Sequence, residues 1–334
     1  MNIAKMPKVE LHRHLELSIR KQTLLDLAPQ FGFKIENEED FKNHFLIDKP
    51  MVNLGSVLNK FLDTQKLLGN EEILERVAYE ACEDAYHEGI KILELRYAPT
   101  FVAMNHPNLD FQTIHNAFVK GIERAQKDFE ICAGLICIIQ RILPVKEAEA
   151  VTEFAIDNKE TFLGLDLADN EEGFDSKPFS PFFLKAKKSG LKVTVHSGEA
   201  NVPGAAWFVK DAVEHLGADR IGHGVRIYTE PEMIEYVKSK NVPLELCPTS
   251  NYLTQAVDTI ESHPFRQLME AGVTTTINTD DPGIFGIDMN HEYQVLVDVH
   301  NFTEKELADC AQNGANASFI KKEIKQKFWP HPII

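Results

Sequence analysis

Two histidines end a short apolar stretch near the start of the chain, in the segment Leu11-His12-Arg13-His14. Side chains alternate along an extended strand, so His12 and His14 would point to the same side, as two ligands of one metal ion must. A single H-x-H pair is weak evidence, because such pairs also arise by chance. The other apolar runs of the chain determine how much weight the pair carries.

Four later apolar runs end in residues of the same chemical kind. Their ends read His196-Ser197-Gly198-Glu199, Gly222-His223-Gly224, Cys247-Pro248-Thr249-Ser250-Asn251 and Asn278-Thr279-Asp280-Asp281. Burial would otherwise select aliphatic residues directly after such runs. Because the polar groups fall at the carboxyl ends of several predicted strands, the sequence indicates one shared site rather than scattered surface residues.

The side chains expected at that site suit metal-assisted hydrolysis at an electrophilic carbon. Three histidines and a carboxylate suit one divalent ion, with Zn²⁺ the best match, and leave one position for water: His12, His14, His196 and Asp280. Such an ion lowers the pKa of bound water to about 7, which makes hydroxide available at neutral pH. Glu199 would serve as general acid or base. His223 and Asp281 would orient the hydroxide and take up its proton.

An alternation of short apolar runs with helical patterns must position these residues. The predicted strands are Val9–His12, Ile90–Leu95, Ile131–Ile139, Phe162–Leu167, Leu191–His196, Arg220–Gly222, Pro243–Cys247 and Val273–Thr279. Helical spacing is found between them, over Glu71–Glu88, Phe111–Phe129, Val145–Asn158, Pro231–Lys240 and His263–Ala271. This order predicts an α/β protein with a parallel sheet, either closed as a (β/α)₈ barrel or open and doubly wound.

The spread of the site residues along the chain favours the closed barrel. In an open sheet of sequential order, the first and eighth strands would lie about 34 Å apart, since neighbouring strands are ~4.8 Å apart. The chain also has no G-x-G-x-x-G after the first strand and no P-loop. We therefore predict a TIM-type (β/α)₈ barrel forming a single domain over residues 1–334. Residues 20–69 are predicted to form a helical insertion over one mouth of the barrel.

Composition excludes several classes of partner. The chain has 334 residues with 35 Lys and Arg against 51 Asp and Glu, a net charge of −16. So acidic a chain is a poor ligand for nucleic acids or anionic membranes. No apolar run is long enough to span a bilayer, no signal-peptide core follows the start, and the five cysteines show no C-x-x-C spacing. We expect a cytoplasmic protein with a small-molecule substrate, and the oligomeric state is not predicted.

The ordered motifs resemble those of the adenosine deaminase family of metal-dependent amidohydrolase barrels, over nearly the whole chain. They are His12-Arg13-His14, His196-Ser197-Gly198-Glu199, Gly222-His223-Gly224 and Asp280-Asp281, together with Glu94–Pro99 and Cys247–Asn251. The resemblance implies that His12, His14, His196 and Asp280 bind one zinc ion. It further implies that Glu199 protonates purine N1, and that His223 and Asp281 serve the attacking water. The expected substrate is a purine nucleoside, adenosine and also deoxyadenosine, with inosine and ammonia as products of the former.

Two positions depart from the family pattern, and both concern substrate binding. After the second histidine the family usually has Leu-Asp-Gly, whose aspartate is associated with the sugar; here the segment is Leu15-Glu16-Leu17. The family also has a glycine whose backbone approaches purine N3, and Asp169 stands in its place. The family places apolar groups over the substrate, and Phe61 stands at the matching position in this chain. The substrate-binding residues expected from the resemblance are His14, Glu16, Asp169, Asp281 and Phe61.

The departures leave other substrates open. One alternative is a deaminase of another adenine compound: free adenine, aminodeoxyfutalosine or an N6-substituted adenine nucleotide. Another is a non-catalytic purine-binding barrel, against which the intact Glu199 and zinc set argue. The remaining histidines, His263 among them, are predicted to be surface or packing residues, and the acidic segments Glu36–Asp40 and Asp169–Glu172 solvated loops.

Overall fold

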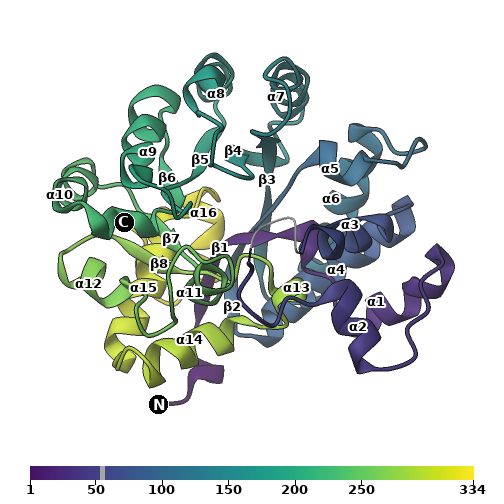
Figure 1. Ribbon diagram of the computed structural model, residues 1–334, viewed down its shortest axis with the longest axis horizontal. Helices are drawn as coiled ribbons and strands as arrows, with labels where there is room; N and C mark the ends of the chain where they lie inside the picture. The colour runs from purple at the N-terminus through teal and green to yellow at the C-terminus, as the bar shows by residue number, and fades with distance from the viewer. Residues whose placement is uncertain (53–56) are drawn as a thin grey trace.

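Eight parallel strands form one sheet in which each strand pairs with the next along the chain (Figure 1). The computed structural model describes residues 1–52 and 57–334. The strands are β1 Lys8–His14, β2 Ile90–Tyr97, β3 Cys132–Gln140, β4 Phe162–Ala168, β5 Lys192–Ser197, β6 Arg220–His223, β7 Leu244–Leu246 and β8 Thr275–Ile277.

The sheet closes between its first and last strands, just beyond the end of β8. The Asp280 N–H donates to the carbonyl of His12 at 2.8 Å, and the His14 N–H donates to the carbonyl of Asp280 at 2.9 Å. These two bonds form a parallel bridge opposite Arg13. The predicted (β/α)₈ barrel is confirmed, and its closure brings β1 and the segment after β8 side by side.

Helices surround the barrel and connect its strands (Figure 1). Residues 20–69, where an insertion is predicted, contain α1 Lys21–Leu27, α2 Glu38–Phe45 and α3 Leu58–Lys66. Asn37 caps α2 by accepting the N–H groups of Glu39 and Asp40, so this acidic segment begins a helix instead of forming only a loop. The other helices are α4 Glu71–His87, α5 Pro99–Ala103, α6 Phe111–Asp128, α7 Glu147–Asp157, α8 Ser180–Lys188, α9 Ala205–Asp211, α10 Pro231–Lys240, α11 Pro248–Leu253, α12 Phe265–Glu270, α13 Pro282–Phe285, α14 Met289–Asp298, α15 Glu304–Ala317 and α16 Lys322–Lys325.

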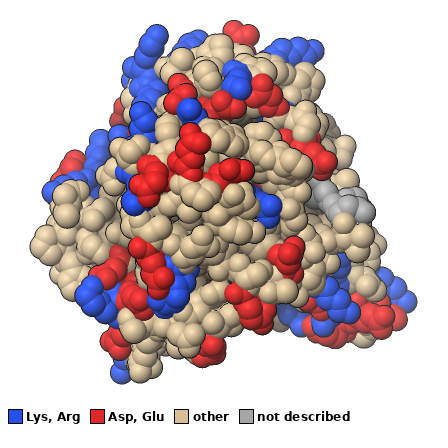
Figure 2. Space-filling model, turned by 60° about the vertical axis from the view of Figure 1, so that its left-hand side comes forward, with Lys and Arg blue, Asp and Glu red and all other residues tan. Residues whose placement is uncertain are grey.

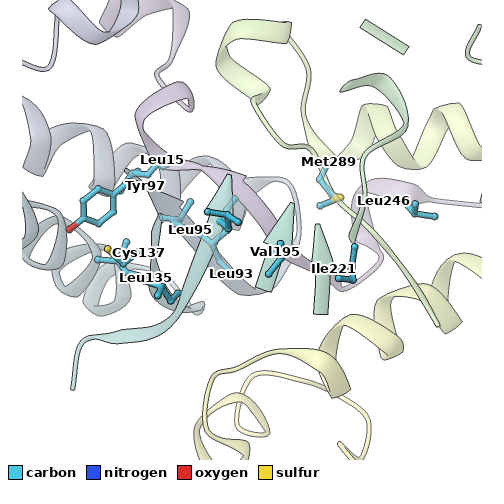
Figure 3. Close-up of a cluster of buried hydrophobic side chains, with 14 of the residues drawn as sticks. Leu15, Leu93, Leu95, Tyr97, Leu135, Cys137, Val195, Ile221, Leu246 and Met289 are labelled. Carbon is cyan, nitrogen blue, oxygen red and sulfur yellow. The ribbon is translucent and has the colours of Figure 1, made fainter. Parts of the chain in front are cut away.

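The main hydrophobic core lies between the strands and the surrounding helices. Figure 3 shows part of it, with Leu93, Leu95 and Tyr97 of β2 among the buried side chains. The alternate residues of the same strand, Glu94 and Arg96, face the barrel interior, since they pair with side chains of other strands. This alternation lets one strand pack apolar groups outward and carry charge inward.

Inside the barrel, beneath the predicted site, five buried charged residues form a network that we call the barrel-floor network. Glu245 accepts from Arg96 at 2.7 Å and from Arg220 at 2.5 Å, and Arg220 also donates to Glu94 at 2.7 Å. Burial acts to raise the pKa of Glu245, but the two guanidinium groups outweigh it and hold that pKa well below its usual range. Paired in this way, the network gives the site a fixed polar support. Its members are Glu94, Arg96, Asp166, Arg220 and Glu245.

The predicted strands are found, with differences at their ends. Strand β7 stops at Leu246 because α11 starts at Pro248, with Cys247 in the N-cap position. Strand β8 stops at Ile277, and Asp280 adopts a left-handed backbone with φ of 63° soon after it. Among the described residues, no helix is long and apolar enough to cross a bilayer. The face drawn in Figure 2 intersperses basic and acidic groups, without a broad basic area.

Candidate active site

Four predicted ligand side chains meet at the carboxyl end of the barrel. His12 and His14 come from β1, His196 from β5, and Asp280 from the bridge that closes the sheet. Oδ1 of Asp280 lies 3.2 Å from Nε2 of His12 and 3.3 Å from Nε2 of His14. Nε2 of His14 lies 3.2 Å from Nε2 of His196. The groups whose ligand atoms all lie within 4.8 Å of one another are His12, His196, His223 and Asp280, and His14, Asp280 and Asp281, so Asp280 links the four predicted residues.

These residues fit a divalent metal ion. Tetrahedral zinc with bonds of about 2.0–2.1 Å places neighbouring ligand atoms about 3.3 Å apart, close to the distances above. Nε2 of His12 is buried and has no hydrogen-bond partner, which is costly unless a ligand satisfies it. His223 also approaches, because one of its ring nitrogens falls within 4.8 Å of ligand atoms of His12, His196 and Asp280.

Carboxylates behind two of the histidines fix how the rings are presented. Nδ1 of His12 lies 2.8 Å from Glu245, and Nδ1 of His196 lies 3.0 Å from Asp166. Arg96 joins these two carboxylates, donating to Asp166 at 2.8 Å and to Glu245 at 2.7 Å. With Nδ1 occupied in this way, both Nε2 atoms are free to bind a metal.

Sequence reasoning assigned no role to these supporting carboxylates, although a signal was present. Asp166 lies in Leu165-Asp166-Leu167 and Glu245 in Leu244-Glu245-Leu246, so each is a single acid within a buried apolar run. A charge at the centre of a buried strand needs a partner across the barrel. Such a position predicts an interior ion pair.

The two consecutive aspartates differ in their electrostatic surroundings. Burial acts to raise the pKa of Asp280, but His12, His14 and His223 outweigh it and hold that pKa well below its usual range. Burial and the adjacent Asp280 both raise the pKa of Asp281 well above its usual range. Oδ1 of Asp281 is buried without a hydrogen-bond partner. One aspartate is therefore suited to hold a cation and the other to hold a proton.

Glu199 lies beside the same cluster and outside the ligand set. Its Oε2 is 3.6 Å from Nε2 of His223, and its Oε1 accepts from Thr254 at 3.0 Å. Burial, with Asp280 and then Glu171 adding negative charge nearby, raises its pKa to about 7. A carboxyl with such a pKa is available as an acid near neutral pH.

The loop that carries Glu199 is held by Glu171. The Glu171 carboxylate accepts the backbone N–H groups of Gly198, Glu199 and Ala200, each at 2.8 Å. Glu171 is only 5% exposed, so the prediction of a solvated loop over Asp169–Glu172 is wrong at this residue. No feature of the sequence around Glu171 distinguishes it from its exposed neighbour Glu172.

Of the residues expected to contact the substrate, Glu16 is buried and Phe61 packs against an apolar cluster. Oε1 of Glu16 accepts the N–H of Ala98 at 2.9 Å, while its Oε2 is buried without a partner. Leu17 and Phe61 belong to one apolar cluster, with Phe61 partly buried against it. That cluster includes Ile284 and Phe285, which follow Asp281 directly in α13. Apolar cover is thus placed next to the aspartate pair.

Asp169 occupies a backbone conformation that glycine adopts without strain. Its φ is 84°, in the left-handed region. Its side chain accepts from the N–H of Asn170 at 2.8 Å and from Gln140 at 3.1 Å. Aspartate is among the residues that tolerate this region because its side chain bonds locally. The substitution therefore keeps a backbone shape that a glycine would also take.

Comparison with known proteins identifies similar chains. The family described as "Adenosine deaminase" matches residues 7–330. An adenosine deaminase of Pectobacterium atrosepticum is 34% identical over 325 residues, covering 97% of this chain and 95% of the relative. One from Yersinia pseudotuberculosis is 36% identical over 324 residues, covering 96% of each.

Solved structures with the same fold are also similar. An adenine deaminase from Arthrobacter aurescens aligns with a TM-score of 0.87 at 25% identity, covering 96% of each chain. An amidohydrolase from Burkholderia ambifaria with bound Zn gives a TM-score of 0.86 at 26% identity, covering 97% of this chain and 89% of that one. The N6-mAMP deaminase of Arabidopsis gives 0.85 at 28% identity, covering 98% and 97%.

Proposed function

The chain belongs to the adenosine deaminase family, and we propose that it hydrolyses adenosine to inosine and ammonia, with deoxyadenosine as a second substrate. Such an enzyme is a hydrolase acting on carbon–nitrogen bonds. The observation that carries the proposal is the position of Glu199, an acid with a pKa raised to about 7, beside His223 and the His/Asp cluster. A protonated carboxyl at that place suits delivery of a proton to the purine ring.

We assign one zinc ion per chain to His12, His14, His196 and Asp280. The close approach of their ligand atoms and the unpartnered Nε2 of His12 support the assignment. When bound, zinc supplies hydroxide at neutral pH by lowering the pKa of water. The relative from Burkholderia ambifaria, which holds Zn, supports the choice of metal.

The side chains around the cluster then divide the remaining chemistry. Attack at C6 pushes electron density onto N1, and Glu199 donates a proton there, which avoids a ring anion. We assign His223 and Asp281 to the attacking water. Nε2 of His223 lies 3.9 Å from Asp280, and Asp281, which follows Asp280 in the chain, is also buried. Ammonia leaves from the tetrahedral carbon and the 6-oxo purine remains.

The residues expected to contact the substrate are assigned to the purine and the sugar. The unpartnered Oε2 of Glu16 would accept a ribose hydroxyl, a role the longer side chain can fill in place of aspartate. The Asp169 N–H would donate to purine N3, since its left-handed backbone matches that of a glycine. Phe61 would cover the ring, and His14 and Asp281 would border it.

Phosphorylated substrates fit this site less well. The basic residues around the end of β1 are Arg13, Arg20 and Lys21, and all three are already paired with carboxylates. Arg13 donates to Glu88 at 2.7 Å, and Arg20 donates to Asp84 at 2.7 Å and Glu83 at 2.5 Å. A phosphate would have to displace these carboxylates. This separates the proposed activity from that of the N6-mAMP deaminase of Arabidopsis.

Parallel kinetics on adenosine, adenine, AMP, N6-methyl-AMP and aminodeoxyfutalosine, following ammonia or amine release, test the proposal. We expect kcat/KM for adenosine at least tenfold above that for adenine, about 1.4 kcal/mol of sugar-derived transition-state binding. AMP and N6-methyl-AMP should be poor substrates. Faster turnover of adenine or aminodeoxyfutalosine would show that Glu16 and Leu17 select a different compound. No release from any of the five by zinc-loaded protein would favour a binding protein instead.

A further inference from the structure

A buried histidine outside the proposed mechanism lies behind His223. His263 precedes α12 and is 3% exposed, and Asn251 of α11, which is fully buried, lies between the two rings. Nε2 of His263 is 3.1 Å from Oδ1 of Asn251, and Nδ2 of Asn251 is 3.0 Å from Nδ1 of His223. The three side chains form a continuous hydrogen-bonded chain that ends at the proposed active site.

A backbone group fixes the direction of this chain. The N–H of Phe265 lies 3.2 Å from Nδ1 of His263, and a backbone N–H can only donate. Nδ1 of His263 must therefore accept, which places the proton of the neutral ring on Nε2. Burial lowers the pKa of His263 to about 3, so the ring is neutral at any working pH.

The orientation of the Asn251 side-chain amide follows from the position of the proton on His263. Because Nε2–H of His263 donates, the atom of Asn251 that faces it must be the oxygen. The NH₂ group of Asn251 then faces His223 and donates to its Nδ1. A histidine whose Nδ1 accepts carries its proton on Nε2 when neutral.

We infer that His263 and Asn251 are positioning residues that hold His223 in the tautomer with its proton on Nε2. The inference rests on the proposed function and divides the labour within it. Nε2 of His223 lies 3.6 Å from Glu199 and 3.9 Å from Asp280, so its N–H points into the site. His223 therefore donates a hydrogen bond to the attacking oxygen and does not accept a proton through Nε2.

The arrangement also opposes the other tautomer of His223. With its proton on Nδ1, the ring would direct an N–H at the NH₂ of Asn251. Two donors would then face each other between buried side chains, and neither N–H group would have an acceptor. A single amide thus selects which ring nitrogen faces the reaction.

The direct test is the tautomer of His223 in the zinc-loaded protein. Long-range ¹H–¹⁵N NMR spectra of protein labelled with ¹⁵N-histidine distinguish a protonated Nε2 from a protonated Nδ1, and the His223→Gln variant identifies the signal. We expect Nε2 of His223 to carry the proton in the wild-type protein. A proton on Nδ1 would overturn the inference, whatever the variants do.

A substitution that reverses one hydrogen bond tests the role of Asn251. In Asn251→Asp the carboxylate still accepts from His263, but it also accepts from His223, so the proton of His223 should move to Nδ1. We expect kcat for adenosine to fall at least about tenfold, since a wrong tautomer removes the correctly placed group. KM and zinc content should change less than about twofold. An unchanged tautomer with unchanged kcat would contradict the assignment.

A matched variant separates this effect from that of an added charge. Asn313→Asp introduces the same change at a half-buried amide of α15, which donates to the carbonyl of Thr275. It should leave the His223 tautomer and kcat unchanged. If the wild-type spectrum shows a protonated Nε2 but adenosine is not hydrolysed, the proposed function is wrong and the tautomer assignment stands.

Discussion

The carboxylate of Glu171 accepts the backbone N–H of Glu199 at 2.8 Å, so one acid holds the main chain from which another enters the site. The N–H groups of Gly198 and Ala200, on either side of Glu199, donate to the same carboxylate at the same distance. Glu171 thereby fixes the loop and also places a negative charge near Glu199. That charge is the third contribution, after burial and Asp280, to the raised pKa of Glu199.

The first prediction concerns pH. Glu199 must be protonated to act, so kcat/KM should fall as the pH rises through the pKa of this group, raised to about 7. Glu171→Gln removes an anion that raises this pKa, so the alkaline limb should move to lower pH. We expect kcat/KM to drop about three- to tenfold more at alkaline than at acidic pH.

Glu172→Gln is the matched control, because it removes the same charge from an exposed neighbour. Its pH profile should coincide with that of the wild type. A Glu171→Gln profile that keeps its alkaline limb in place would mean that Glu171 acts only on the fold of the loop.

The second prediction concerns the acid itself. Glu199→Gln keeps the size of the side chain and its contact with Thr254 but cannot deliver a proton to N1. We expect kcat to fall by roughly 10²–10⁴, with little change in KM. Steady-state kinetics with parallel zinc analysis measure this. A variant with a tenth of the wild-type kcat would show that another group supplies the proton.

The third prediction concerns the metal. Purified protein should contain about one zinc per chain; a chelator should abolish activity and added zinc should restore it. Asp166→Asn and Glu245→Gln weaken the supports of His196 and His12, so zinc affinity should fall about 10–100-fold. Competition with a chromophoric chelator measures this. Full activity without any divalent ion would refute the metal assignment.

The fourth prediction concerns Leu17. Leu17→Ala removes bulk from the apolar cluster shared with Phe61. The kcat/KM of adenosines with large 5′ substituents should therefore rise relative to the kcat/KM of adenosine. We expect the ratio of the two kcat/KM values to shift at least about threefold, at a cost of about 2–5 kcal/mol in stability. Thermal unfolding and paired kinetics measure both effects. An unchanged ratio would place Leu17 away from the sugar.

The sequence predicted the barrel and the proximity of His12, His196 and Asp280 because the strands and the polar residues that follow them are local patterns. Each strand is an apolar run, and polar residues follow it directly, as at His196 and Asp280. The ends of β7 and β8 were placed too late because turn geometry ends them. The left-handed backbone of Asp280 is one such feature, and the residue type alone does not predict it.

Residues that act through other residues could not be found in this way. His263 was predicted to be only a surface or packing residue. Its burial fits packing, but its hydrogen bond to Asn251 depends on how the segment after α11 returns beneath His223. Glu171 depends likewise on the distance between the ends of β4 and β5. Such contacts join segments that are distant in the sequence, so a short stretch of sequence does not predict them.

The bridge that closes the barrel also determines when, during synthesis, the proposed metal site can form. His12 belongs to the first strand, whereas Asp280 follows the last one, and they meet only through the bonds that close the sheet. A growing chain on the ribosome can therefore not offer the full proposed ligand set until residue 280 has emerged. Contacts so distant in sequence also slow folding. Binding of the metal at the proposed site must therefore follow synthesis of the last barrel strand, and a chain that lacks this strand cannot assemble the proposed centre.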